Sequence, residues 1–243
     1  MYRKYVPFLL FLFFLYGCNG NKQEEKEDVS VFVDLPQLKA EGEITAVTLY
    51  SSTSYFQYKM QPMGYEYDLI NDFAKSQGLK LNIKVAENPA RLIEMLEAGE
   101  ADVVAYPIPI NNKLKQEVIY CGREDISSQV LIQRANKGDK LLTDVTQLID
   151  KNVYVKPNTK YSERLKNLDE ELGGGIHIQK VENDSIATED LIEMVSLGEI
   201  PYTISDDNTA RLNKTYYWNI NVDLKVSFPQ RSSWVVRKSS PDL

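Results

Sequence analysis

Residues 92–100 read LIEMLEAGE, and residues 191–199 read LIEMVSLGE. Both copies place Leu, Ile and Met on one side of a helix, end in a glycine, and lead into an apolar stretch, 102–106 or 201–205. A glycine takes the left-handed conformation that ends many helices, so each copy predicts a helix that turns into a buried strand. Good helix formers can coincide by chance, but the recurrence of Gly-Glu and a strand in the same order argues against chance.

The segments around the two copies repeat the same plan. In the first half, strands are expected at 44–49, 79–85 and 102–106, with a helix between each pair; Asn88 and Pro89 start the second helix as N-cap and N1. In the second half, strands are expected at 152–156, 176–181 and 201–205, with helices at 161–172 and from an N-cap at Thr188. The sequence therefore predicts an α/β protein of two lobes, in which ligands bind at the strand ends.

Composition limits the partners. The chain has 243 residues, 43% of them hydrophobic and 26% charged, and a formal net charge of −7. This is the composition of a globular protein. No run of Lys or Arg is dense enough to follow a phosphate backbone, so we expect no nucleic-acid partner.

The N-terminus has the features of an export signal. Arg3 and Lys4 precede an apolar run at 6–16, and Cys18 follows in a segment that resembles the lipobox of bacterial lipoproteins. We expect a signal peptide at 1–18, lipidation of Cys18, and a flexible acidic tether at 19–42. An ordinary cleaved signal with an incidental cysteine is the alternative. The expected location is the outer membrane facing the periplasm, with exposure on the cell surface as a variant.

Catalytic chemistry has little support. His177 alternates with apolar neighbours, which places it on the solvent face of a strand, and Cys121 is expected to pack in the core. One histidine and one remaining cysteine make no metal site, and the glycines at 173–175 follow a helix, unlike a phosphate-binding loop. Glu94, Glu97 and Glu193 are expected to face solvent. We expect no catalytic residues, no metal and no cofactor.

Several segments together resemble one family. They are GYEYDL at 64–69, GEADVV at 99–104, GEIPYTISD at 198–206, SSTSYF at 51–56 and ARLNKTYY at 210–217. Residues 44–243 resemble the extracellular solute-binding proteins of family 3, which have a two-lobed Venus flytrap fold, each lobe a βαβ-type mixed sheet flanked by helices. Within that family they are most similar to the N-terminal module of the membrane-bound lytic murein transglycosylase F group, although Trp218 replaces a proline of that pattern.

The resemblance implies a domain plan and a mechanism. Lobe 1 is expected at 43–125, lobe 2 at 126–225 and a return to lobe 1 at 226–243, truncated before a final helix. The lobes would close over a small ligand about two crossing segments, near 123–129 and 222–228, without covalent chemistry.

The resemblance also implies a charge clamp for amino acids. In the family an arginine of lobe 1 binds the ligand carboxylate and an aspartate of lobe 2 binds its ammonium. The aspartate corresponds to Asp206, whereas Leu114 stands at the arginine position. Asp206 could instead only cap the following helix. The expected ligand-binding residues are Tyr50, Tyr55, Tyr106, Pro107, Asn158, Thr159 and Asp206, with Phe56, Tyr65 and Tyr67 in the core.

Two functions fit these expectations. The first is a noncatalytic regulatory module of the transglycosylase F type, which binds a cell-wall peptide or an amino-acid-like ligand and serves a catalytic domain. The second is a receptor that delivers amino acids or short peptides to a permease.

Overall fold

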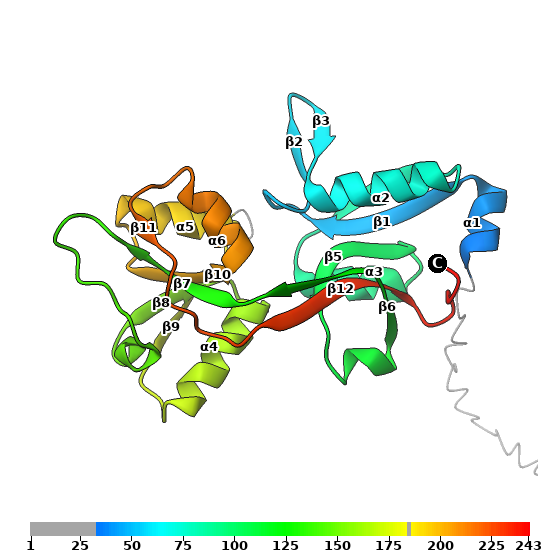
Figure 1. Ribbon diagram of the computed structural model, residues 1–243. Coiled ribbons are helices and arrows are strands. Elements are labelled where there is room, and N and C mark those ends of the chain that lie inside the picture. Colours follow the sequence, from blue (N-terminus) through cyan, green and yellow to red (C-terminus); the bar gives the residue numbers. More distant parts are fainter. Residues whose placement is uncertain (1–32, 184–185) are drawn as a thin grey trace, which may run out of the picture. The chain divides into compact units, whose positions relative to one another are not determined.

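The computed structural model describes residues 33–183 and 186–243. The predicted signal peptide, Cys18 and most of the predicted tether lie outside these residues. The described chain forms two five-stranded mixed sheets with helices on both faces, which confirms the predicted fold class (Figure 1).

Lobe 1 is built on the first sheet, whose order is β4-β1-β5-β12-β6. Its strands are β1 (Glu43–Leu49), β4 (Lys80–Ala86), β5 (Val103–Pro109), β6 (Val118–Ser127) and β12 (Gln230–Arg237). Strands β4, β1 and β5 are parallel, and β12 runs antiparallel to β5 and β6. Helices α1 (Leu35–Glu41) and α2 (Tyr65–Ser76) pack on one face and α3 (Pro89–Glu97) on the other. A short hairpin of β2 (Phe56–Tyr58) and β3 (Gln61–Met63) and a 3-10 turn η1 (Leu114–Gln116) complete it.

Lobe 2 is built on the second sheet, whose order is β11-β7-β10-β8-β9. Its strands are β7 (Gln129–Arg134), β8 (Asn152–Val155), β9 (His177–Lys180), β10 (Tyr202–Asp206) and β11 (Ile220–Asn221). Helix α4 (Lys160–Glu171) covers one face, and α5 (Thr188–Leu197) and α6 (Asp207–Lys214) cover the other. A 3-10 turn η2 (Val145–Leu148) precedes β8.

The repeated motif has the same place in both lobes. Helix α3 connects β4 to β5 across β1, and α5 connects β9 to β10 across β8. Leu92 and Leu191 are 0% and 1% exposed, and Gly99 and Gly198 have φ of 71° and 81°. The predicted helix, glycine stop and buried strand are confirmed in both copies. The N-cap of α5 is Ala187, so the prediction of Thr188 was wrong by one residue.

The two segments that join the lobes lie side by side. The outgoing chain passes from β6 to β7 at Ser128, and the returning chain runs from β11 to β12 (Figure 1). The amide N–H of Val226 donates to the carbonyl of Gln129 at 2.9 Å, and the Gln129 N–H donates to Oγ of Ser227 at 2.8 Å. This paired crossing provides the connection about which the lobes could rotate.

The expectation of a tether through residue 42 was wrong for residues 35–41, which form α1. Asp34 caps this helix through a capping box with Gln37, and Leu38 is only 2% exposed. The side chain of Asp34 also accepts a hydrogen bond from the Asp242 N–H at 3.1 Å. The start of the described chain is therefore fixed to its last residues by hydrogen bonds and by apolar burial.

Candidate functional site

A cavity of about 1540 Å³ lies between the two lobes. Lobe 1 lines it with the loop after β1, the first turn of α2 and the second half of β5. Lobe 2 lines it with the loop before α4, the start of α5 and the end of β10. The carboxyl end of β1 in lobe 1 therefore faces the carboxyl ends of β8 and β10 in lobe 2 across the cavity, as expected for α/β sheets.

Most of the predicted ligand-binding residues lie in this cavity. Six of the seven line it: Tyr50, Tyr106, Pro107, Asn158, Thr159 and Asp206. They come from four segments that are far apart in the sequence and that the fold brings together. Their contact with a ligand stays a prediction.

The sequence predicts Tyr55 in the cavity and Tyr65 in the core, and the structure shows the reverse. Tyr55 is 8% exposed and packs edge to face against Tyr67, with ring centroids 5.8 Å apart, and it is not among the lining residues. Tyr65 is 50% exposed, lines the cavity, and accepts a hydrogen bond from Arg123 at 2.8 Å. Because each residue turns a helix by about 100°, Tyr65 lies roughly 140° from the buried Ile70. The helix period would have placed Tyr65 outside the core.

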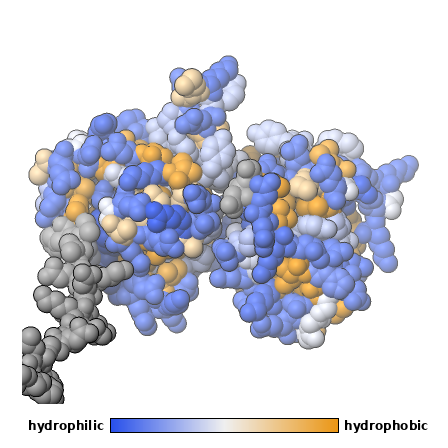
Figure 2. Space-filling model, turned by 180° about the vertical axis from the view of Figure 1, so that it is seen from behind, coloured by the Kyte–Doolittle hydropathy of each residue, from blue (hydrophilic) through white to orange (hydrophobic). Residues whose placement is uncertain are grey.

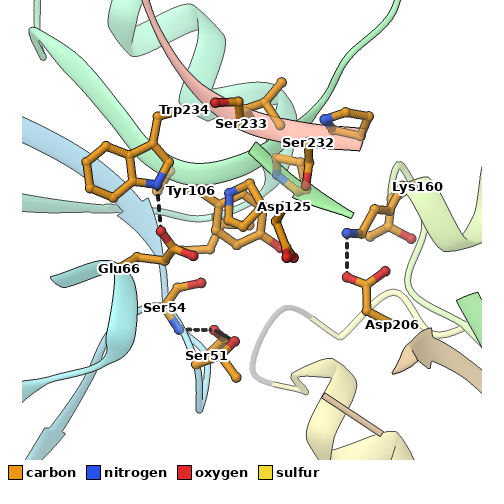
Figure 3. Close-up of a pocket in the computed structure, with 18 of the residues that line it drawn as sticks. Ser51, Ser54, Glu66, Tyr106, Asp125, Lys160, Asp206, Ser232, Ser233 and Trp234 are labelled. Carbon is orange, nitrogen blue, oxygen red and sulfur yellow. Dashed lines mark hydrogen bonds and ion pairs between the residues drawn. The ribbon is translucent and has the colours of Figure 1, made fainter. Parts of the chain in front are cut away.

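Asp206 is the N-cap residue of α6, but its side chain makes no capping hydrogen bond. One carboxylate oxygen instead lies 2.5 Å from Nζ of Lys160 and accepts from the hydroxyl of Tyr161 at 3.1 Å. The side chains of Lys160 and Asp206 are 19% and 16% exposed, and Figure 3 shows them facing each other at the cavity wall. The alternative in which Asp206 only caps the helix is wrong, because its side chain makes no capping hydrogen bond and pairs with Lys160 instead.

The hydroxyl groups of Tyr161 and Tyr106 lie close enough to the Asp206 carboxylate to be affected by its negative charge. Burial, and then the charge of Asp206, raise the pKa of Tyr161 well above its usual value. Burial raises the pKa of Tyr106 as well, with further contributions from Asp206, Glu189 and Glu66. Both hydroxyls therefore stay protonated at neutral pH and can donate hydrogen bonds.

Lobe 1 adds a carboxylate that sequence reasoning missed. Glu66 accepts a hydrogen bond from the indole N–H of Trp234 at 2.6 Å (Figure 3). Burial raises the pKa of Glu66, and the nearby Asp125 raises it further, while the Trp234 bond and Arg123 act in the opposite direction. Glu66 belongs to the GYEYDL segment, but Trp234 is 168 residues away, so no spacing rule could have paired them.

Leu114, which the sequence places at the expected arginine position, lines the cavity from η1. The cationic lining residues are Lys113, Arg123, Lys156 and Lys160. Arg123 donates to Tyr65, and Nζ of Lys156 donates to the backbone carbonyl of Asn183. Lys113 is exposed beside Leu114.

A direct contact joins the lobes at the rim of the cavity. The carboxylate of Glu189, in the first turn of α5, accepts from the Ser52 N–H at 3.0 Å and from the Ser52 hydroxyl at 2.8 Å. Ser52 lies in the loop after β1, so lobe 2 touches lobe 1 away from the crossing segments.

Cys121, His177 and three glutamates are the other residues that the sequence offers as candidates for chemistry. Burial raises the pKa of Cys121 to about 11, which leaves a neutral thiol at pH 7. His177, Glu94, Glu97 and Glu193 are exposed. Within residues 33–183 and 186–243, no three His, Cys, Asp or Glu side chains gather closely enough to hold a metal ion.

The outer surface is mostly hydrophilic in the view of Figure 2, with apolar residues in small groups on both lobes. None of the helices in the described part of the chain is long and apolar enough to span a bilayer.

The family model of the bacterial extracellular solute-binding proteins, family 3, matches residues 44–243. Among curated proteins, the membrane-bound lytic murein transglycosylase F of Desulfosudis oleivorans is 31% identical over 211 residues, covering 85% of this chain and 44% of the relative. The protein of the same name from Pseudomonas fluorescens is 28% identical, covering 83% of this chain and 41% of the relative. This chain therefore spans less than half the length of these relatives.

Solved structures share the fold. A mutant of ArgBP from T. maritima superimposes with a TM-score of 0.72 at 20% identity, covering 86% of this chain and 87% of that one. The arginine-bound form of truncated ArgBP gives a TM-score of 0.69 at 19% identity, covering 84% and 92%. At these identities the likeness establishes the two-lobed architecture alone. The family match over most of the chain, together with this architecture, makes the protein a member of the bacterial extracellular solute-binding proteins, family 3.

Proposed function

We propose that this chain is a noncatalytic ligand-binding domain, of the kind found at the N-terminus of lytic murein transglycosylase F, that binds a small peptide or amino-acid-like solute between its lobes. The observation that carries the proposal is Asp206, whose carboxylate faces the cavity from the end of β10 instead of capping α6. A partly buried carboxylate in a cleft is a suitable partner for a ligand ammonium group.

The lining of the cavity suits an amino-acid-like or peptide ligand. The volume between the lobes, about 1540 Å³, would shrink on closure and has room for either. Exposed Tyr50 and partly buried Tyr106 offer apolar area with a polar tip, which suits peptide chains. A cell-wall-derived peptide fits these features, and the transglycosylase name of the relatives points to the same source.

The proposed mechanism is closure of the lobes on the ligand. A ligand that touches both lobes stabilises the closed arrangement by its higher affinity for it. The crossing segments at Ser128 and at 222–229 would act as the hinge, and the contact of Glu189 with Ser52 would hold the rim. In this proposal the domain regulates a catalytic domain and breaks no bond itself.

A stand-alone receptor for a permease is the second candidate. It is favoured by the arginine-bound form of truncated ArgBP, of which this chain covers 92%, since a chain of this fold and similar length holds an amino acid there. The DNA beyond the codon of Leu243 separates the two: a reading frame that continues into a lysozyme-like domain supports regulation, and a stop after one helix beside permease genes supports uptake.

The proposal includes a lipid anchor at Cys18, which would place the domain at the outer membrane facing the periplasm. Metabolic labelling with a radioactive fatty acid should mark the wild-type chain and leave a Cys18→Ala variant unlabelled. Equal labelling of both would refute the anchor without touching the ligand-binding proposal.

The binding proposal is tested by thermal unfolding with two ligand sets, free amino acids and cell-wall stem peptides. A ligand at 100 times its Kd stabilises the folded state by about 2.7 kcal/mol. We expect at least one member to raise the Tm of the wild-type protein and to lose most of its effect in Asp206→Ala. Flat curves across both sets would refute the proposed function.

A further inference from the structure

The ion pair between Lys160 and Asp206 occupies the place where the proposed function puts the ligand's ammonium group. Nζ of Lys160 lies 2.5 Å from Oδ2 of Asp206, and the Tyr161 hydroxyl donates to the same oxygen. A ligand amine must therefore compete with a cation that is already bound to the protein.

The position of Lys160 also suits an anion. It is the first residue of α4, directly after Asn158 and Thr159, which line the cavity. The amide groups and dipole at the start of a helix attract negative charge. The ammonium group of Lys160 can therefore turn from Asp206 to a ligand carboxylate that is held above the loop of Asn158 and Thr159.

Two of the remaining cations of the cavity are used elsewhere, and the third, Lys113, is exposed beside Leu114. Arg123 donates to the Tyr65 hydroxyl, and Lys156 donates to the Asn183 carbonyl. The position at which the family's amino-acid binders carry an arginine is Leu114, which has no charge. In this cavity Lys160 is thus the cation placed against Asp206.

We propose that Lys160 stands in for the ligand's ammonium group in the free protein and pairs with the ligand's carboxylate in the complex, replacing the arginine that position 114 lacks. The inference rests on the proposed function and names its substrate class: a zwitterion whose ammonium and carboxylate groups both reach the end of β10 and the start of α4.

The number of ion pairs explains why a zwitterion should bind more tightly than a ligand that has only an amine. A zwitterion breaks the pair of Lys160 with Asp206 and forms two new pairs, one with each residue. A ligand with only an amine breaks one pair and forms one, and it leaves Lys160 unpaired although its side chain is 81% buried (19% exposed). A buried charge without a partner is unfavourable.

The test compares free acids with C-terminal amides of the same amino acids and stem peptides. For wild-type protein, calorimetric titration should give a Kd at least about 10-fold lower for the acid than for its amide. In Lys160→Met this ratio should fall below about 3-fold, and the amides should bind more tightly than they do to wild type. Lys160→Arg should restore the preference for the acid, because arginine keeps the charge and can pair with a carboxylate.

Lys166→Met is the matched control, since it removes another lysine of α4 whose side chain is 73% exposed and is not among the cavity-lining residues, and it should leave the ratio unchanged. Thermal unfolding of each variant checks that it is folded. An unchanged acid preference in Lys160→Met, or amides that bind it no more tightly than wild type, would overturn the inference while leaving the proposed function intact. Absence of binding by every ligand to every variant would instead refute the proposed function, and this inference with it.

Discussion

Replacing Gly64 by alanine should destabilise the domain strongly, for a reason that is visible in the backbone. Gly64 has φ 135° and ψ 150° and precedes α2 without any side-chain cap. The first turn of α2 is capped by the preceding loop instead, because the Tyr65 N–H donates to the Thr53 carbonyl at 2.8 Å and the Tyr67 N–H donates to that of Ser54 at 3.1 Å. This capping draws the loop against residue 64.

The magnitude follows from two terms. A Cβ on Gly64 would lie 2.3 Å from the Ser54 carbonyl oxygen and 3.0 Å from the Tyr55 Cα, and neither atom belongs to a side chain that can rotate away. A residue with a side chain in this backbone region costs about 1–3 kcal/mol, and relieving the overlap costs about 1–3 kcal/mol more. The sum, about 2–6 kcal/mol, corresponds to a fall in Tm of roughly 5–20 °C for a domain of this size.

Urea unfolding of Gly64→Ala and Gly78→Ala measures the difference. Gly78 also has a positive φ, 73°, but no atom lies within 4 Å of its virtual Cβ, so alanine there should cost only about 1 kcal/mol. The loop held by Gly64 lines the cavity with Ser51 and Ser54, so ligand binding should weaken together with stability. Equal unfolding free energies for the two variants would refute the reasoning.

Three further predictions concern the core, the rim and pH. Leu92→Ala and Leu191→Ala should each lower the free energy of unfolding by about 2–5 kcal/mol in urea, because both side chains are fully buried at equivalent places in the two lobes. Glu189→Ala removes the acceptor of the contact with lobe 1; a hydrogen bond of about 0.5–1.5 kcal/mol implies a roughly 2- to 10-fold rise in ligand Kd by calorimetry. Because the folded-state pKa of Glu66 is raised above 4.5, its protonation stabilises the fold below pH 4.5, and this stabilisation is lost as pH rises through the folded pKa. Glu66→Gln should therefore be most stable relative to wild type near pH 7 and lose that advantage on acidification.

Each of these predictions has a contrary result. A cost below 1 kcal/mol for either leucine would show that its helix does not hold its lobe together. An unchanged Kd for Glu189→Ala, with Glu182→Ala as the exposed control, would exclude a role for the rim contact. An advantage of Glu66→Gln that grows below pH 4.5 would reverse the sign of the electrostatic argument.

Local sequence patterns predicted most of the fold because the helices and strands are amphipathic. Leu92 and Leu191 follow helical periods, and the glycines after them mark the turns into buried strands. Helix α1 was missed although its signals were present: Asp34 with Gln37 forms a capping box, and Leu38 supplies the apolar contact. The acidic composition of the preceding segment concealed a short helix.

The sequence correctly placed in the cavity those residues whose position depends only on where a strand ends. Asp206 and Tyr106 lie in the cavity because the strands that carry them end or pass there. The partners of these residues depend on tertiary contacts: Lys160 meets Asp206 across 46 residues, and Trp234 meets Glu66 across 168. No periodicity within one element encodes such pairs.

The most direct test of the account is small-angle X-ray scattering of the protein with and without a saturating ligand from the amino-acid or stem-peptide sets. The account holds that a solute bound between the lobes favours the closed arrangement, so the radius of gyration should fall on saturation, and Asp206→Ala should need more ligand to reach the same value. Saturable binding with an unchanged radius of gyration in both proteins would contradict closure of the lobes on the ligand.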